Sequence, residues 1–139
     1  MKSYTDLEQS KKLAEILPIE SADMYYQYVL PKSDKIRYNP EIGNPTNTLK
    51  WYNEGYVFSG KEPITMDEFC VPCWSLGSLL DILPEGTKLL KSSNISSVSD
   101  IKYFCDCPKY NVDKWFDNPI NACYEVILKL KEYDTISKI

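Results

Sequence analysis

Residues 117 to 130 combine a helix start signal with a periodic apolar pattern: Asp117-Asn118-Pro119-Ile120-Asn121-Ala122-Cys123-Tyr124-Glu125-Val126-Ile127-Leu128-Lys129-Leu130. Asn118 is the predicted N-cap, because its side-chain oxygen can accept a hydrogen bond from a backbone N–H that has no partner within the helix. Pro119 fills the first helical position, where the missing N–H donor costs nothing. The apolar residues then recur at steps of three and four: Ile120, Cys123, Val126, Ile127, Leu130 and Tyr133. We expect this stripe to be buried in an ordinary core, with no catalytic group on it.

Two further elements are predicted before residue 31. Thr5-Asp6-Leu7-Glu8 has the spacing of a capping box and predicts a helix that ends before Pro18. Ser21 to Leu30 is rich in tyrosine and valine, which is typical of a strand.

The next part of the chain is predicted to contain a loop and a hairpin. Lys32 to Thr48 is polar and broken by prolines and a glycine, so we expect a long surface loop. Leu49 to Phe58 carries aromatic and β-branched residues around Asn53-Glu54-Gly55, a pattern that favours a tight β-hairpin.

A central helix and several short strands are predicted after residue 74. Ser75 is the expected N-cap of a helix from Leu76 to Leu83. The remaining predicted elements are strands at Lys88–Lys91 and Ile101–Cys105, a serine-rich loop at Ser92–Ser99 between them, and a strand at Tyr110–Phe116.

The order of these elements predicts an α+β fold rather than a parallel α/β fold, because helices and strands do not alternate regularly. We expect an antiparallel sheet of about four to six short strands, with N-terminal, central and C-terminal helices packed on it. The length of 139 residues suits a single domain over residues 1–139.

Composition narrows the classes of function. The formal net charge is −4 and Arg37 is the one arginine, so we expect no nucleic-acid binding. No apolar run resembles a signal peptide or a membrane span, which favours a cytoplasmic protein with reduced thiols. The sequence contains no histidine, which excludes an imidazole base and any metal site that needs a histidine ligand from this chain.

The cysteines are the sharpest local motif. Cys70-Val71-Pro72-Cys73 and Cys105-Asp106-Cys107 together supply four thiols, the ligand set of a structural zinc site. A thioredoxin-like redox pair of Cys70 and Cys73 is a second hypothesis, although Cys70 precedes the Ser75 cap by five residues. The third hypothesis is that these cysteines are small core residues, as free cysteines often are.

The tyrosines indicate a different kind of site. The chain contains eleven, and Tyr25, Tyr26 and Tyr28 put rings on both faces of one predicted strand. Tyrosine is enriched at protein interfaces, so these residues are a candidate interaction surface, together with the loop Lys32–Thr48. Cross-strand packing inside the sheet is the alternative.

Three blocks carry a family resemblance: Thr5-Asp6-Leu7-Glu8-Gln9-Ser10-Lys11-Lys12-Leu13-Ala14-Glu15-Ile16-Leu17-Pro18, Cys73-Trp74-Ser75-Leu76-Gly77-Ser78-Leu79-Leu80 and Asn118-Pro119-Ile120-Asn121-Ala122-Cys123-Tyr124-Glu125. In combination the chain resembles small uncharacterised proteins of prophages and mobile elements of anaerobic gut bacteria. The resemblance implies an accessory protein of a mobile element. It brings no activity, ligand or catalytic residue with it.

Two functional hypotheses follow from the sequence. The first is a non-catalytic accessory or interaction protein, not an enzyme, which binds an unidentified protein partner or forms a homodimer and needs no cofactor. The alternative is a cysteine-dependent protein, with a zinc site or a redox pair drawn from Cys70, Cys73, Cys105 and Cys107.

Overall fold

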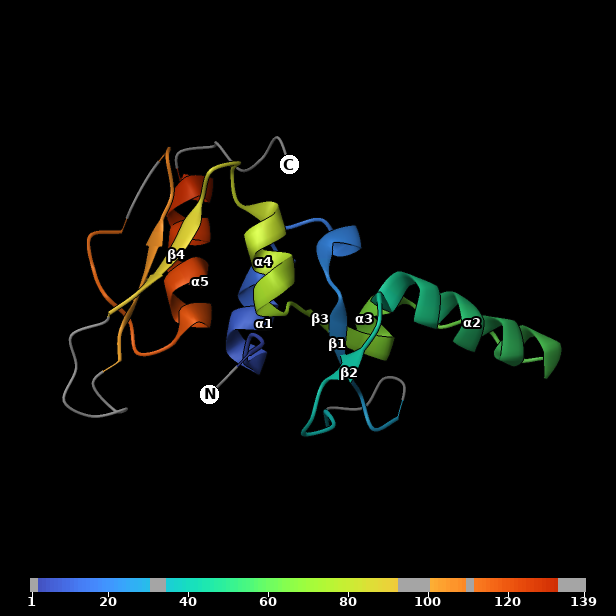
Figure 1. Cartoon of the computed structure of the whole chain (residues 1–139). Coiled ribbons are helices and arrows are strands. Elements are labelled where there is room, and N and C mark those ends of the chain that lie inside the picture. Colours follow the sequence, from blue (N-terminus) through green and yellow to red (C-terminus); the bar gives the residue numbers. More distant parts are fainter. Residues whose placement is uncertain (1–2, 31–34, 93–100, 110–111, 133–139) are drawn as a thin grey trace. The chain divides into compact units, whose positions relative to one another are not determined.

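The computed structural model describes residues 3–30, 35–92, 101–109 and 112–132 (Figure 1). The chain divides into two compact units, and the single domain over residues 1–139 stays a prediction. One unit is Asp6–Trp74, and the other combines Met1–Thr5 with Ser75–Ile139. Each unit is described by itself below.

The unit Asp6–Trp74 contains a small antiparallel sheet with helices on it. Its elements are α1 (Leu7–Ala14), the 3₁₀ helix η1 (Ile19–Ser21), β1 (Met24–Gln27), β2 (Glu41–Ile42), α2 (Pro45–Phe58), α3 (Met66–Phe69) and β3 (Cys70–Cys73). The strand order is β2-β1-β3. In the β1–β3 ladder Tyr25 pairs with Pro72, and Tyr26 pairs with Val71.

Both faces of strand β3 are covered. Side chains of a strand alternate between the two faces of the sheet, so Tyr25 and Cys70 share one face with each other. On that face they form a core cluster with Ile64 and Phe69, against which side chains from α2 and α3 pack. Helix α1 contacts β3 and lies on the side of the strand away from α3 (Figure 1). All four residues of β3 are therefore buried.

The second unit contains α4 (Leu76–Ile82), β4 (Lys88–Lys91), β5 (Tyr103–Asp106) and α5 (Pro119–Glu132). Strands β4 and β5 pair in antiparallel register, and α5 packs against both β5 and α4. Along β5 the buried residues are Tyr103 and Cys105, which alternate with half-buried ones. This period of two is that of a strand with one face on a core.

The predicted C-terminal helix is confirmed. Asn118 is its N-cap, and its Oδ1 accepts a hydrogen bond from the Asn121 N–H at 2.9 Å. Every residue of the predicted stripe that the structure describes is buried: Ile120, Cys123, Val126, Ile127 and Leu130. Tyr133, which the pattern also includes, lies outside the described residues.

The central helix is confirmed as well. Ser75 is the N-cap of α4, and its Oγ accepts a hydrogen bond from the Ser78 N–H at 3.2 Å. The strands predicted at Lys88–Lys91 and Ile101–Cys105 correspond to β4 and β5. Most of the predicted loop Ser92–Ser99 lies outside the described residues.

The α+β class is confirmed, but the single sheet of about four to six strands is wrong. Within the described residues there are two antiparallel sheets, one of three strands and one of two. The physical reason is that each of the two sheets is covered by helices of its own unit. Helices α1, α2 and α3 flank the first sheet, and α5 covers the second.

The largest departure from the predicted structure is α2. The sequence predicts a loop at Lys32–Thr48 and a hairpin at Leu49–Phe58, whereas residues 45 to 58 form one helix preceded by the short strand β2. Asn44 is placed as its cap: the Asn44 Oδ1 accepts from the Thr46 N–H at 3.0 Å, and its Nδ2 donates to the Ala22 carbonyl at 2.9 Å. Pro45 then takes the first helical position.

Three smaller predictions need correction. The N-cap of α1 is Asp6 rather than Thr5, and the capping box joins Asp6 to Gln9. Strand β1 is shorter than the predicted Ser21–Leu30, and Ser21 is instead the last residue of η1. Tyr110–Phe116 contains no strand in the part that the structure describes, where Phe116 forms a single bridge to Tyr103. Tyr110 itself lies outside that part.

Candidate functional site

The two cysteines of the C-x-x-C motif lie on strand β3 and not in a turn. Cys70 and Cys73 are three residues apart on an extended strand, so their side chains leave it on opposite faces. Both are buried, and neither forms a disulfide with a described residue. This geometry does not bring the two sulfurs together, either as ligands of one metal ion or as partners of one disulfide.

The environment of Cys70 keeps its thiol protonated. Its Sγ donates a hydrogen bond to the Met66 Sδ at 3.5 Å. Burial, together with the nearby negative charge of Asp67, raises the pKa of Cys70 to about 12. The nucleophile in thiol chemistry is the thiolate, and a raised pKa disfavours the thiolate of Cys70 near neutral pH.

The cysteine pair that the fold does bring together is Cys105 and Cys123. Cys105 lies on β5 and Cys123 on α5, and the two thiols are hydrogen-bonded. Their hydrogen bond lowers the pKa of Cys105 and raises that of Cys123. The sequence places Cys123 in the apolar stripe of a helix, and its spacing from Cys105 carries no signal for this pairing.

The four predicted zinc ligands belong to two different units of the chain. Cys70 and Cys73 belong to the unit Asp6–Trp74, and Cys105 and Cys107 belong to the other unit. Among the described residues, no group of three or more Cys, Asp or Glu side chains is arranged to hold a metal ion. The zinc site stays a prediction.

The predicted tyrosine surface is mostly interior. Tyr25 and Tyr26 are only 7% and 5% exposed, because α2 and α3 cover one face of β1 and the other face is also buried. The Tyr25 ring lies 5.8 Å from the ring of Phe69. Tyr28 is half-buried. Cross-strand and core packing, the alternative considered for these tyrosines, describes Tyr25 and Tyr26.

Three of the large exposed apolar side chains among the described residues lie on helix α2. Trp51 is 80% exposed, Val57 60% and Phe58 94%. At about 100° per residue, the outward side chains of α2 fall within about 120° of the helix circumference. We call this surface the α2 face, and its residues are Asn47, Lys50, Trp51, Glu54, Val57 and Phe58.

The opposite side of α2 is also apolar. Leu49 and Tyr52 pack against the core cluster, and the Tyr52 ring lies 5.3 Å from that of Phe69. Because the inward side already carries these contacts, the helix does not need the apolar residues of the α2 face for its own packing. Their presence on the surface therefore requires another explanation.

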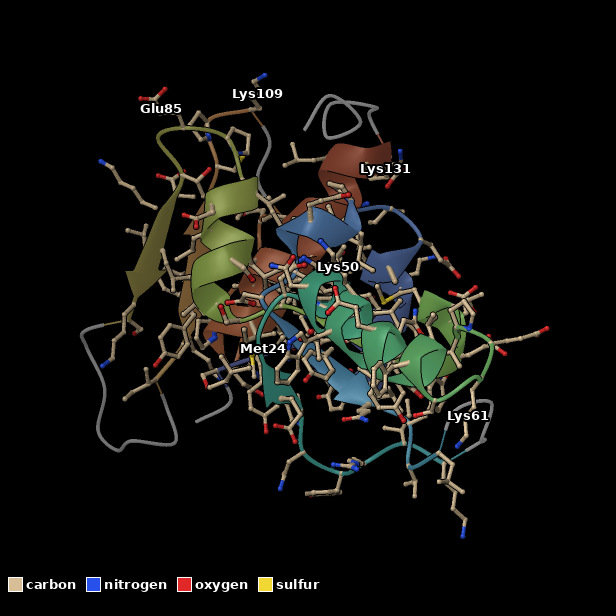
Figure 2. All side chains as sticks on the ribbon, turned by 90° about the vertical axis from the view of Figure 1, so that its right-hand side faces the viewer. Met24, Lys50, Lys61, Glu85, Lys109 and Lys131 are labelled. Atoms are coloured by element: carbon tan, nitrogen blue, oxygen red, sulfur yellow. The ribbon has the colours of Figure 1, made fainter. Side chains whose placement is uncertain are left out.

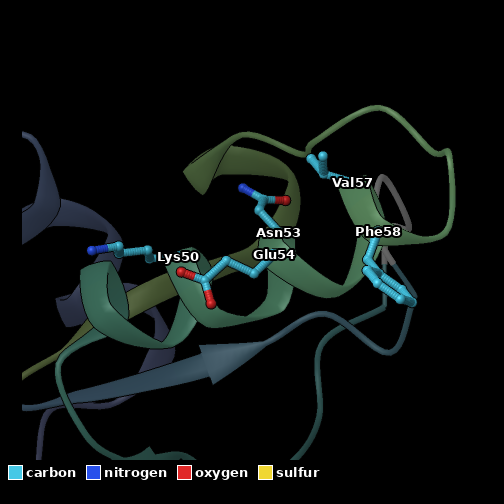
Figure 3. A pocket seen from close by; sticks show the side chains of 5 residues that line it. All are labelled: Lys50, Asn53, Glu54, Val57 and Phe58. Carbon is cyan, nitrogen blue, oxygen red and sulfur yellow. The ribbon is translucent and has the colours of Figure 1, made fainter.

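An open groove runs along α2 and overlaps the α2 face (Figure 3). Its volume is about 530 Å³, and its lining residues are Lys50, Asn53, Glu54, Val57 and Phe58. Figure 3 shows Val57 and Phe58 near the end of the helix. The groove thus combines an apolar end with two charged side chains of opposite sign.

Those two charges are available for a partner. Lys50, labelled in Figure 2, is an exposed residue of α2, and the exposed Glu54 lies one turn further along. Within residues 3–30, 35–92, 101–109 and 112–132, neither Lys50 nor Glu54 forms an ion pair. Protein interfaces combine aromatic residues at their centre with a polar rim.

The sequence contains a signal for α2 that the sequence analysis missed. Asn44-Pro45 repeats the Asn118-Pro119 start of α5, with the same N-cap and first-position roles. The turn residues Asn53-Glu54-Gly55 favour a hairpin at the same place, and the hairpin was predicted instead of the helix.

Comparison of the chain with family models, with curated proteins and with solved structures finds no match. In the part of the chain that the structure describes, no helix has both the length and the apolar composition needed to cross a bilayer.

Proposed function

We propose that this protein is a non-catalytic interaction protein that binds another protein chain through the α2 face. The family resemblance supplies the proposed context, an accessory protein of a phage or mobile element that works in the cytoplasm. Binding and not bond chemistry is the proposed activity.

One observation carries the proposal. Trp51 and Phe58 are 80% and 94% exposed on one side of a helix whose other side already packs on a core. Exposed tryptophan and phenylalanine side chains are costly in water, and aromatic residues are enriched in the centres of interfaces. A partner that covered both rings would remove a large apolar area from water.

The cysteine-dependent alternative has less support. The high pKa of Cys70 disfavours a thiolate at neutral pH. The five cysteine side chains are also buried, so a substrate would not reach their thiols. The hydrogen bond between Cys105 and Cys123 joins a strand to a helix inside a core, which is a structural role.

The test compares two surface variants. Trp51→Ser/Phe58→Ser removes both exposed rings of the α2 face, and Tyr38→Ser removes a ring outside α2 that is also 94% exposed. Each purified protein is immobilised and exposed to lysate and to an untagged copy of the chain, and the retained proteins are identified by mass spectrometry. We expect the wild type and Tyr38→Ser to retain the same proteins, and the double variant to lose them.

Equal retention by all three proteins would overturn the proposal. Because the substituted side chains are exposed, thermal unfolding of the three proteins should be nearly the same, which separates lost binding from lost folding.

A further inference from the structure

We propose that the partner of the α2 face is the α2 face of a second copy of this chain, in an antiparallel helix pair with two-fold symmetry. This inference rests on the proposed function and names its partner.

The first argument is the distribution of apolar side chains around α2. Leu49 and Tyr52 are directed towards the core cluster, while Trp51, Val57 and Phe58 are exposed on the other side. Large apolar side chains of a helix normally lie on a side that is covered. The fold covers one side of α2, so the other side is the one that a partner would cover.

The second argument is that the charges on the α2 face are complementary to themselves. Lys50 and Glu54 are one turn apart, carry opposite signs and have no ion-pair partner among the described residues. In an antiparallel pair whose two-fold axis lies midway between them, Lys50 of each copy faces Glu54 of the other. Two ion pairs then form, and no like charges meet.

The same axis brings the aromatic residue at the centre of the helix against its own copy. The level midway between Lys50 and Glu54 is that of Tyr52, and Trp51 is one residue, about 1.5 Å, away from it. A two-fold axis across the helices keeps both Trp51 rings on the same side of the pair, so the two rings meet. Stacked or tilted aromatic pairs contribute beyond their buried area.

The size of this contact sets its strength. Helix α2 has 14 residues and is therefore about 21 Å long. One helix pair of this length buries less than the roughly 1,600 Å² of a standard stable interface. We therefore expect a reversible dimer whose population rises with protein concentration.

The experiment is sedimentation equilibrium of the full chain over a wide concentration range, with charge-reversal variants. The proposed dimer has two symmetry-related contacts between position 50 of one copy and position 54 of the other. Lys50→Glu or Glu54→Lys alone puts like charges together at both contacts, and each variant should raise the dimer dissociation constant about tenfold. The double reversal Lys50→Glu/Glu54→Lys restores both pairs and should return the dissociation constant to about the wild-type value.

Matched controls make the same changes in net charge away from α2. Lys11→Glu and Glu41→Lys alter exposed residues of α1 and β2 and should leave the dissociation constant within about twofold of wild type. Trp51→Ser should abolish the dimer, because it removes the ring that meets its own copy.

The outcomes separate this inference from the proposed function. A chain that stays monomeric while its α2 face retains a different protein overturns the homodimer and leaves the proposed function standing. A monomer that retains nothing through α2 overturns both. A dimer that is indifferent to the charge reversals, or that the double reversal does not rescue, uses another surface and overturns the inference.

Discussion

The side chain of Asn53 forms two hydrogen bonds with the backbone of Ile64. Its Nδ2 donates to the Ile64 carbonyl at 2.9 Å, and its Oδ1 accepts from the Ile64 N–H at 2.8 Å. The amide of one side chain thus satisfies both backbone groups of a residue in the segment that leads to α3. This pair of bonds fixes α2 against that segment and so holds the α2 face outward.

Asn53→Ala should destabilise the protein. It leaves the N–H and C=O of Ile64, a buried residue, without these partners, and we expect a loss of about 1–3 kcal/mol in the free energy of unfolding. Urea denaturation measures this loss. Asn47→Ala on the exposed side of the same helix is the control and should change the free energy by less than about 0.5 kcal/mol. Equal losses would show that the Asn53 bonds do not hold α2.

Two glycines near the end of α2 should respond in opposite directions to alanine. A Cβ at Gly55 or at Gly60 would meet nothing within 4 Å, so the pair differs in backbone conformation and not in space. Gly55 lies inside the helix, and Gly55→Ala should stabilise the protein by about 0.5–1 kcal/mol. Gly60 has φ +80°, and Gly60→Ala should cost about 1–2 kcal/mol.

Thermal or urea unfolding of the two variants measures both changes. The Gly55 result also distinguishes the helix from the hairpin that the sequence predicts, because a hairpin turn would use a glycine with positive φ there. Destabilisation by Gly55→Ala would contradict the helix.

Asp117 should make part of the stability depend on pH. Its hydrogen bond and ion pair with Lys102 lower the pKa of Asp117 in the folded protein. A lowered pKa means that the folded state favours the ionised carboxylate. The stabilisation is therefore present above the pKa of the unfolded chain and is lost as the pH falls through the folded pKa.

Asp117→Asn should remove this contribution. Its deficit against the wild type in urea denaturation should be present at neutral pH and should disappear in acid. Asp113→Asn alters a nearby exposed carboxylate that forms no ion pair with the described residues, and it should show no such pH-dependent deficit. A deficit of Asp117→Asn that is the same at both pH values would contradict the prediction.

Replacement of the C-x-x-C thiols should weaken the fold without abolishing it. Cys70→Ser puts a hydroxyl into the cluster of Tyr25, Ile64 and Phe69, which should cost about 1–3 kcal/mol. Cys70→Ala is the control, since it removes the thiol without adding a polar group. The double variant Cys70→Ser/Cys73→Ser should still unfold cooperatively.

Metal analysis of the purified wild type by mass spectrometry tests the zinc hypothesis directly. We expect less than about half an equivalent of zinc. A full equivalent, together with complete loss of folding in the double variant, would establish a structural metal site.

The elements that could be predicted are those with strong local signals. In α5 the Asn118 cap and the apolar stripe agree, so the local sequence and the core require the same helix. The same is true of Ser75 and α4.

The prediction was wrong at α2 because two local signals conflict. Asn44-Pro45 indicates a helix start, whereas Asn53-Glu54-Gly55 between aromatic residues indicates a hairpin. Contacts distant in the sequence decide between them: Tyr52 packs on Phe69, and Asn53 bonds to Ile64. An Asn-Pro pair is not sufficient on its own, since Asn39-Pro40 is followed by strand β2 and not by a helix.

The sequence alone determined the α+β class and the capped helices α4 and α5, because periodicity and caps depend on neighbouring residues. It also determined that the chain has no imidazole, since this follows from composition. The tertiary structure decided which tyrosines are buried, that Cys105 meets Cys123, and that Trp51 and Phe58 remain outside. Those outcomes depend on which elements pack together, and burial is a property of contacts between segments that are far apart in the chain.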